Sequence, residues 1–167
     1  MVWSPRPRTR RTAINRAARE ALRLMPKDGN LERLLCNLGA HRGRPIRVVE
    51  HDFGPEGGPS GLTYVMKDRD YIVIDKSAGP SRRAVILSHE IAHMLLGHSG
   101  ASDTSSWVSA VAPDLDPRLV ERVLHRDSYT TDDETAAEEV ATVLAVEHGR
   151  RVRAAELRAN PISARLR

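Results

Sequence analysis

Cysteine, aromatic residues and long apolar runs are all scarce in this chain of 167 residues. The single cysteine, Cys36, excludes an internal disulfide framework and a cysteine-rich zinc finger, and it favours a reducing compartment. With two Trp, three Tyr and one Phe, the core must be built from Leu, Val, Ile and Ala. No apolar run approaches the roughly 18 residues of a membrane span, and none follows the basic N-terminus as a secretory signal requires. The sequence therefore predicts a cytoplasmic protein with no membrane partner.

Basic residues are concentrated at the two ends of the chain. Residues 1–23 contain seven Arg against Glu20 alone, and residues 147–167 contain six Arg against two Glu. Basic ends can contact nucleic acid or an acidic partner. Solvated termini are the alternative, which we favour because no aromatic interleaving or binding motif accompanies the charge.

Composition divides the chain into four predicted regions. Residues 1–11 are rich in Pro and Arg and predict a disordered basic N-terminus. Residues 12–44 predict two N-terminal helices, and residues 45–149 predict the folded core. Residues 150–167 form a basic C-terminal tail.

Strand-like and helical runs alternate in the core and predict an α+β fold. Three short apolar runs predict a mostly antiparallel three-stranded sheet over 45–51, 62–66 and 71–75, the last two forming a hairpin. Apolar residues at helical spacing predict helices over 12–25, from the cap Asn30 to near Gly39, over 82–96, over 117–126, and over 131–148 ending at Gly149. Ser81 is the predicted N-cap of the central helix and Gly97 its C-cap.

The central helix contains the pattern His89-Glu90-Ile91-Ala92-His93. Two His four residues apart lie on one helix face, so both imidazoles can bind one metal ion. Glu90 can then reach a water on that metal and act as a general base. The alternative is a pair of surface His on an amphipathic helix.

A catalytic zinc requires three protein ligands and one open position, so a third ligand must come from elsewhere in the chain. Glu134 and Glu138 share one face of the last helix, where two carboxylates repel unless a cation joins them. We predict that Glu134 binds one zinc ion per chain, with Glu138 accepting a hydrogen bond from the outer nitrogen of His89 or His93.

Three alternatives to this ligand set remain open. Thr131 and Glu134 have the spacing of a capping box, in which Glu134 would only satisfy the helix N-terminus. Glu138 or Glu139 could be the ligand in its place. His98 is another candidate for the third ligand. It follows the helix end, however, and is expected to face solvent there, where the helix dipole favours a His.

The run from His89 to His98, followed by Glu134, Ala137, Val140 and Ala141, resembles the ImmA/IrrE family of small bacterial metallopeptidase-like proteins. The family motif is HExxHxxL followed by a downstream helix with ExxAxxFA, where Val140 replaces the aromatic residue. The resemblance covers about residues 45–147. It implies a small zincin-like domain with the sheet packed on the HExxH helix, a His/His/Glu zinc site, and a cytoplasmic protease that acts on helix-turn-helix repressors of mobile elements or stress responses.

The expected activity is zinc-dependent peptide hydrolysis with Glu90 as the base. Tyr129 and His125 are candidate donors to the oxyanion. The alternative function is a non-proteolytic regulatory or toxin-like binding module with a zincin-like metal site.

Overall fold

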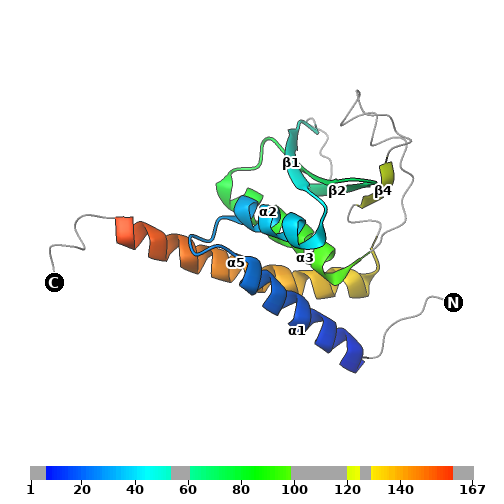
Figure 1. The fold of residues 1–167 in the computed structure, drawn as a ribbon, viewed down its shortest axis with the longest axis horizontal. Helices are drawn as coiled ribbons and strands as arrows, with labels where there is room; N and C mark the ends of the chain where they lie inside the picture. The colour runs from blue at the N-terminus through cyan, green and yellow to red at the C-terminus, as the bar shows by residue number, and fades with distance from the viewer. Residues whose placement is uncertain (1–6, 54–60, 99–119, 125–128, 160–167) are drawn as a thin grey trace.

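The computed structural model describes residues 7–53, 61–98, 120–124 and 129–159 (Figure 1). The helices are α1 (Pro7–Leu24), α2 (Leu31–Arg42), α3 (Pro80–Leu96) and α5 (Thr131–Ala159), and the strands are β1 (Ile46–His51), β2 (Gly61–Met66), β3 (Asp70–Asp75) and β4 (Val120–Leu124). The predicted α+β class is confirmed. None of the described helices is long and apolar enough to cross a membrane.

The sheet contains the three predicted strands and a fourth, in the order β1-β3-β2-β4. Strands β2 and β3 form the predicted antiparallel hairpin, while β1 runs parallel to β3. The prediction of a short helix over 117–126 is wrong, because residues 120–124 form β4 and pair antiparallel with β2. Apolar residues at 120, 123 and 124 suit a helical turn as well as a strand, and pairing with β2 decides between them.

Helix α3 lies between the sheet and the long helix α5 (Figure 1). It contacts β2 and β3 on one side and α5 on the other, while α1 packs along α5 and α3. The core between these layers is aliphatic, as the composition predicts, and its fully buried side chains include Leu34, Leu38, Ile72, Ile74, Ile91 and Leu144. This packing fixes the face of α3 that meets α5.

Glycines end both of the helices that lead into and out of the small sheet. Asn30 is the N-cap of α2 as predicted, and its side chain accepts a hydrogen bond from the amide of Arg33 at 2.8 Å. The helix ends at Gly43, where φ is +66°, instead of near Gly39, which is buried inside the helix. Gly97 ends α3 as predicted, with φ at +69°.

The start of α3 differs from the prediction. Its N-cap is Gly79, which makes no side-chain cap, and Ser81 already lies inside the helix. Pro80 occupies the first helical position, where its fixed φ suits the helix and its missing N–H costs no hydrogen bond. The prolyl ring therefore sets the boundary that the sequence analysis assigned to Ser81.

The two ends of the described chain are helical further than predicted. Helix α1 begins at Pro7, so the predicted disorder is wrong for residues 7–11, while residues 1–6 lie outside the described part. Helix α5 continues through Gly149 to Ala159, into the predicted tail. Packing explains the start of α1 and the passage of α5 through Gly149, because α1 packs against α5 from Arg10 to the contacts of Arg151, while the last turns of α5 project beyond α1 (Figure 1).

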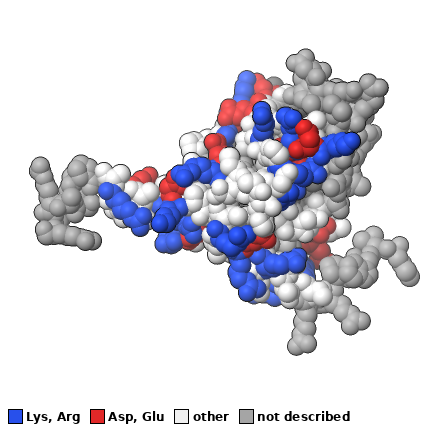
Figure 2. Space-filling view, viewed as in Figure 1, with Lys and Arg blue, Asp and Glu red and all other residues white. Residues whose placement is uncertain are grey.

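Arginines at these ends are paired within the fold. Arg10 lies 2.8 Å from a carboxylate oxygen of Asp132, and Arg151 donates to the carbonyl oxygens of Met25 and Pro26. Arg151 thereby satisfies the end of α1 and anchors the second half of α5. Figure 2 shows Lys and Arg interspersed with acidic and uncharged side chains along the molecule. Part of the basic charge of the chain ends is therefore used in packing α1 against α5.

Candidate metal centre

The two histidines of the HExxH pattern lie side by side on α3. Their Nε2 atoms are 3.0 Å apart, as the spacing of four residues in a helix predicts. The side chain of His93 is only 1% exposed, while that of His89 is 25% exposed and opens toward solvent. Burial lowers the pKa of His93 to about 3, so its imidazole is neutral at physiological pH and able to bind a metal.

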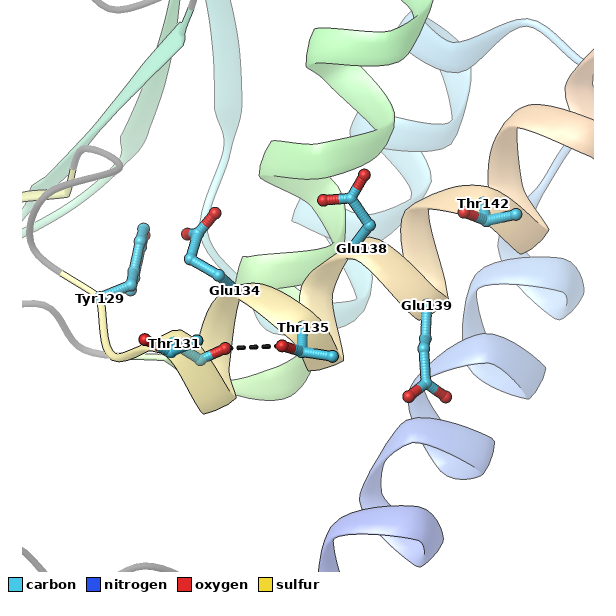
Figure 3. Close-up of a pocket in the computed structure, with 7 residues that line it drawn as sticks. All are labelled: Tyr129, Thr131, Glu134, Thr135, Glu138, Glu139 and Thr142. Atoms are coloured by element: carbon cyan, nitrogen blue, oxygen red, sulfur yellow. Dashed lines mark hydrogen bonds between the residues drawn. The ribbon is translucent and has the colours of Figure 1, made fainter.

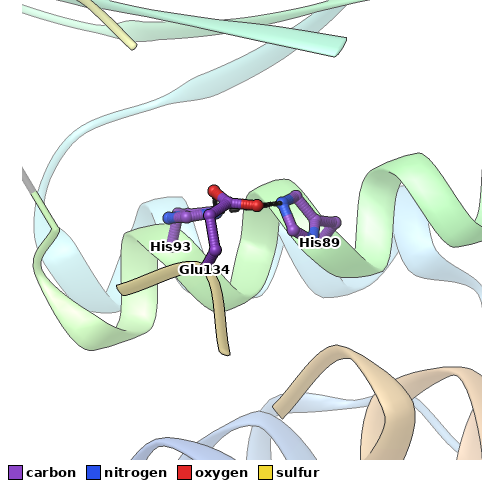
Figure 4. A group of neighbouring side chains, drawn as sticks. All are labelled: His89, His93 and Glu134. Atoms are coloured by element: carbon purple, nitrogen blue, oxygen red, sulfur yellow. Dashed lines mark hydrogen bonds and ion pairs between the residues drawn. The ribbon is translucent and has the colours of Figure 1, made fainter. Parts of the chain in front are cut away.

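Glu134 reaches these histidines from α5 (Figure 4). Its carboxylate oxygens lie 3.6 Å from Nε2 of His89 and 3.2 Å from Nε2 of His93. Helices α3 and α5 pack directly against each other, so the contact joins segments more than 40 residues apart in the chain. The structure thus brings together the three residues that the sequence analysis selected as ligands.

The donor set fits zinc. One donor atom from each of the three residues can be chosen so that all lie within 4.8 Å of one another. In a tetrahedral site with bonds of about 2.0–2.1 Å, neighbouring ligand atoms lie about 3.3 Å apart. The observed separations of 3.0, 3.2 and 3.6 Å scatter around that value. Two imidazoles and one carboxylate form a typical set for catalytic zinc, with a fourth position left for water or substrate.

The capping box at the start of α5 lies one residue earlier than the alternative reading of Glu134 required. The hydroxyl of Thr130 accepts from the amide of Asp133 at 3.2 Å, and the carboxylate of Asp133 accepts from the hydroxyl and the amide of Thr130 at 2.8 and 3.3 Å. Thr130 is therefore the N-cap, and Asp133 completes the reciprocal pair. Glu134 is not needed for the cap, and its carboxylate faces the imidazoles instead.

Glu90 lies next to His89 in sequence but points from α3 toward the sheet. It is buried, and the hydroxyl of Thr63 on β2 donates a hydrogen bond of 2.7 Å to its Oε2. Burial raises the pKa of Glu90 to about 7. The hydrogen bond from Thr63 opposes this shift, and the negative charge of Glu134 adds to it. The carboxyl group is therefore close to half-protonated at neutral pH in the metal-free protein.

Two residues on β2, Gly61 and Thr63, position Glu90 without a recognisable signal in the sequence. A Cβ atom added at Gly61 would lie 2.9 Å from Oε1 of Glu90 and 2.7 Å from a side-chain carbon of Ile86. Only glycine therefore leaves space for the carboxylate beside β2. Thr63 and Gly61 precede Glu90 by more than 25 residues. A contact between a strand and a helix that are this far apart in the chain leaves no local pattern in the sequence.

His98 is turned back into the molecule, which corrects its prediction as a solvent-facing residue. Its side chain is 11% exposed, and its Nδ1 lies 3.0 Å from Nδ1 of His93. Its Nε2 lies 3.4 Å from a carboxylate oxygen of Asp133. Burial, partly opposed by the charge of Asp133, lowers the pKa of His98 below its usual value.

The remaining candidates have different outcomes. Tyr129 stacks on the ring of His93, with centroids 3.8 Å apart and an interplanar angle of 18°. The outer nitrogen of His93 faces His98 and not Glu138, while the other form of the prediction, a hydrogen bond from the outer nitrogen of His89 to Glu138, stays a prediction. Glu138 is exposed on α5, and His125 lies outside the described residues.

A groove runs along the first turns of α5 beside the metal-binding group (Figure 3). It has a volume of about 570 Å³, within the range of small-ligand sites. Its lining residues are Tyr129, Thr131, Glu134, Thr135, Glu138, Glu139 and Thr142. Because Glu134 belongs both to this lining and to the metal-binding group, the groove lies next to the candidate metal position on the α5 side.

Comparison with known families finds a match to the IrrE N-terminal-like domain of a peptidase family over residues 42–157. The match spans the sheet, α3 and most of α5, and so includes all three candidate ligands and Glu90. No curated protein and no solved structure matches the chain.

Proposed function

The chain belongs to the ImmA/IrrE family of metallopeptidases, and from that premise we propose that it is a zinc-dependent endopeptidase acting on a protein regulator. The observation that carries the proposal is the meeting of His89, His93 and Glu134 beside a buried Glu90 whose pKa is about 7. A purely structural zinc site needs no acid–base group at that position, whereas peptide hydrolysis does.

Zinc held by these residues supplies a Lewis acid that polarises the scissile carbonyl and lowers the pKa of water. Glu90 removes a proton from the attacking water as its oxygen bonds to the carbonyl carbon. The same carboxyl group delivers that proton to the departing nitrogen as the carbon–nitrogen bond breaks. Because Thr63 donates to Oε2, we assign the proton transfer to Oε1. Burial raises the pKa of Glu90 above its usual value, which makes its carboxylate a stronger base than an exposed glutamate.

We further propose that the substrate is a helix-turn-helix transcriptional repressor in the cytoplasm, as the resemblance of the motifs to the ImmA/IrrE family implies. Strand β4 is an outer strand of the described sheet and pairs with β2 on one side. The backbone groups of an outer strand can pair with an extended peptide. We propose that an extended segment of the substrate pairs with β4 and that the groove along α5, beside the metal position, holds neighbouring residues of the same segment.

The test uses the zinc-loaded protein and a repressor encoded in its genomic neighbourhood. Intact-mass analysis should show two fragments of the repressor whose masses sum to the parent mass plus one water. The matched control, Glu90→Gln, should retain zinc and lose roughly 100- to 10,000-fold in cleavage rate. If the parent and Glu90→Gln act equally on the repressor without cleaving it, the protein is a binding module and the proposal is wrong.

A further inference from the structure

The candidate ligand His93 has a neighbour at each of its ring nitrogens. Its Nε2 faces His89 and Glu134, while its Nδ1 lies 3.0 Å from Nδ1 of His98. A neutral imidazole carries one proton, so Nε2 offers a lone pair to a metal only when the proton sits on Nδ1. When His93 binds a metal through Nε2, the group that faces Nδ1 must therefore accept a hydrogen bond from it.

Nδ1 of His98 must accept a hydrogen bond from the N–H at Nδ1 of His93 for that arrangement to hold. Its own proton then resides on Nε2, which faces Oδ1 of Asp133 at 3.4 Å. A carboxylate only accepts hydrogen bonds, so Asp133 favours the N–H at that end of the His98 ring. The direction of the hydrogen bond between His93 and His98 thus follows from the charge of Asp133 at the far side of the His98 ring.

The backbone keeps this chain of side chains in place. The left-handed conformation of Gly97 turns the chain after α3, and the amide of His98 donates to the carbonyl oxygen of His93 at 3.1 Å. Asp133 is held by the hydroxyl of Thr130 at 2.8 Å. The ring of Tyr129 stacks on His93 and fixes its plane. Each member is therefore held independently of any metal.

We propose that His98 and Asp133 are positioning residues that hold His93 in the tautomer whose Nε2 lone pair is directed at the metal position. The inference rests on the proposed function, because it concerns the same site. It also assigns a second role to the start of α5. Glu134 approaches the metal position directly, and the preceding Asp133 acts through His98 on a different ligand.

The test compares two substitutions at His98 in the full chain. Asn places its Oδ1 two bonds from Cβ, where His carries Nδ1, and so keeps an acceptor for His93, whereas Leu removes it. In chelator competition, His98→Leu should bind zinc 10- to 100-fold more weakly than the parent, and His98→Asn should stay within about threefold. Asp133→Asn should weaken binding, while the matched control Asp132→Asn, at an exposed acid paired with Arg10, should not.

A second readout is the ring proton of His93 in the zinc-loaded protein, where zinc on Nε2 leaves the proton on Nδ1. In the parent and in His98→Asn, NMR should show this proton hydrogen-bonded and protected from exchange with water, and in His98→Leu it should exchange faster. If the parent binds zinc and His98→Leu matches it in affinity and in this exchange rate, the inference is wrong while the proposed function stands. If the parent binds no zinc, the proposed function fails, and the inference fails with it.

Discussion

Replacing Glu90 with Gln should change how the stability of the metal-free protein depends on pH. Glu90 is 6% exposed, and its pKa is raised from the usual 4.5 to about 7, chiefly by burial. Gln has nearly the same shape and can accept the hydrogen bond from Thr63, but it does not ionise. The substitution therefore removes the titration of this group and leaves the packing almost intact.

The sign of the effect follows from proton binding. Between pH 4.5 and about 7, the folded protein keeps the proton on Glu90 while the unfolded chain has lost it. The folded state then binds more protons, so its free energy of unfolding falls as the pH rises through this range. The difference in pKa corresponds to about 3 kcal/mol of unfolding free energy, which is fully present below pH 4.5 and fully lost above about pH 7.

The measurement is urea denaturation in excess chelator at a series of pH values from 5 to 8.5. We expect Glu90→Gln to gain stability relative to the parent as the pH rises, by up to about 3 kcal/mol. The titration of His93 affects both proteins and cancels in the difference. Glu138→Gln, at an exposed position on α5, is the control and should follow the parent curve. A difference between Glu90→Gln and the parent that stays constant with pH would refute the assignment of the raised pKa to Glu90.

Three further substitutions test the site. In zinc titration, Glu134→Gln should weaken affinity by more than about 100-fold, whereas Thr131→Ala should leave it unchanged, and equal affinities would exclude Glu134 as a ligand. Gly61→Ala should lower the free energy of unfolding by about 1–3 kcal/mol, measured by thermal denaturation, because its Cβ would lie 2.7 Å from a side-chain carbon of α3. An unchanged free energy of unfolding would contradict that close contact. Thr63→Val should lower the rate of peptide cleavage without releasing zinc, since its hydroxyl orients Glu90, and an unchanged rate would show that this hydrogen bond is not used.

The parts of the site that the sequence predicts are those set by local geometry. His89 and His93 lie four residues apart on one helix, and this spacing alone places both imidazoles on the same face. Glu134 was selected because a catalytic zinc needs a third ligand and the last helix offers a carboxylate on a face of small residues. The packing of α3 against α5 then brings that carboxylate to the imidazoles.

The parts that the sequence does not predict depend on contacts between distant segments. Thr63 meets Glu90 only because β2 lies over α3, and His98 meets Asp133 only because the chain turns back at Gly97. The capping box was placed one residue too late, since a Thr and an acidic residue three positions apart occur in two overlapping registers at the start of α5. Asp133 forms the cap with Thr130, because Glu134 faces the histidines of α3 instead.

The extents of the outer helices were also decided by tertiary packing. Gly149 and the Pro- and Arg-rich start of the chain are signals that end or weaken an isolated helix. In the folded protein, Arg151 bonds the carbonyl oxygens at the end of α1, and Arg10 pairs with the start of α5. These contacts between α1 and α5 outweigh the local signals, and the strand at 120–124 is decided in the same way by its pairing with β2.

The division of the metal-binding group between α3 and α5 has a consequence for synthesis on the ribosome. His89 and His93 emerge well before Glu134, and α5 is the last described element to be translated. Helix α1, made first, must also wait for α5 before its packing partner exists. The nascent chain therefore cannot assemble all three donor atoms until translation has passed the start of α5. The proposed peptidase therefore has no complete centre with which to attack its own unfinished chain during synthesis.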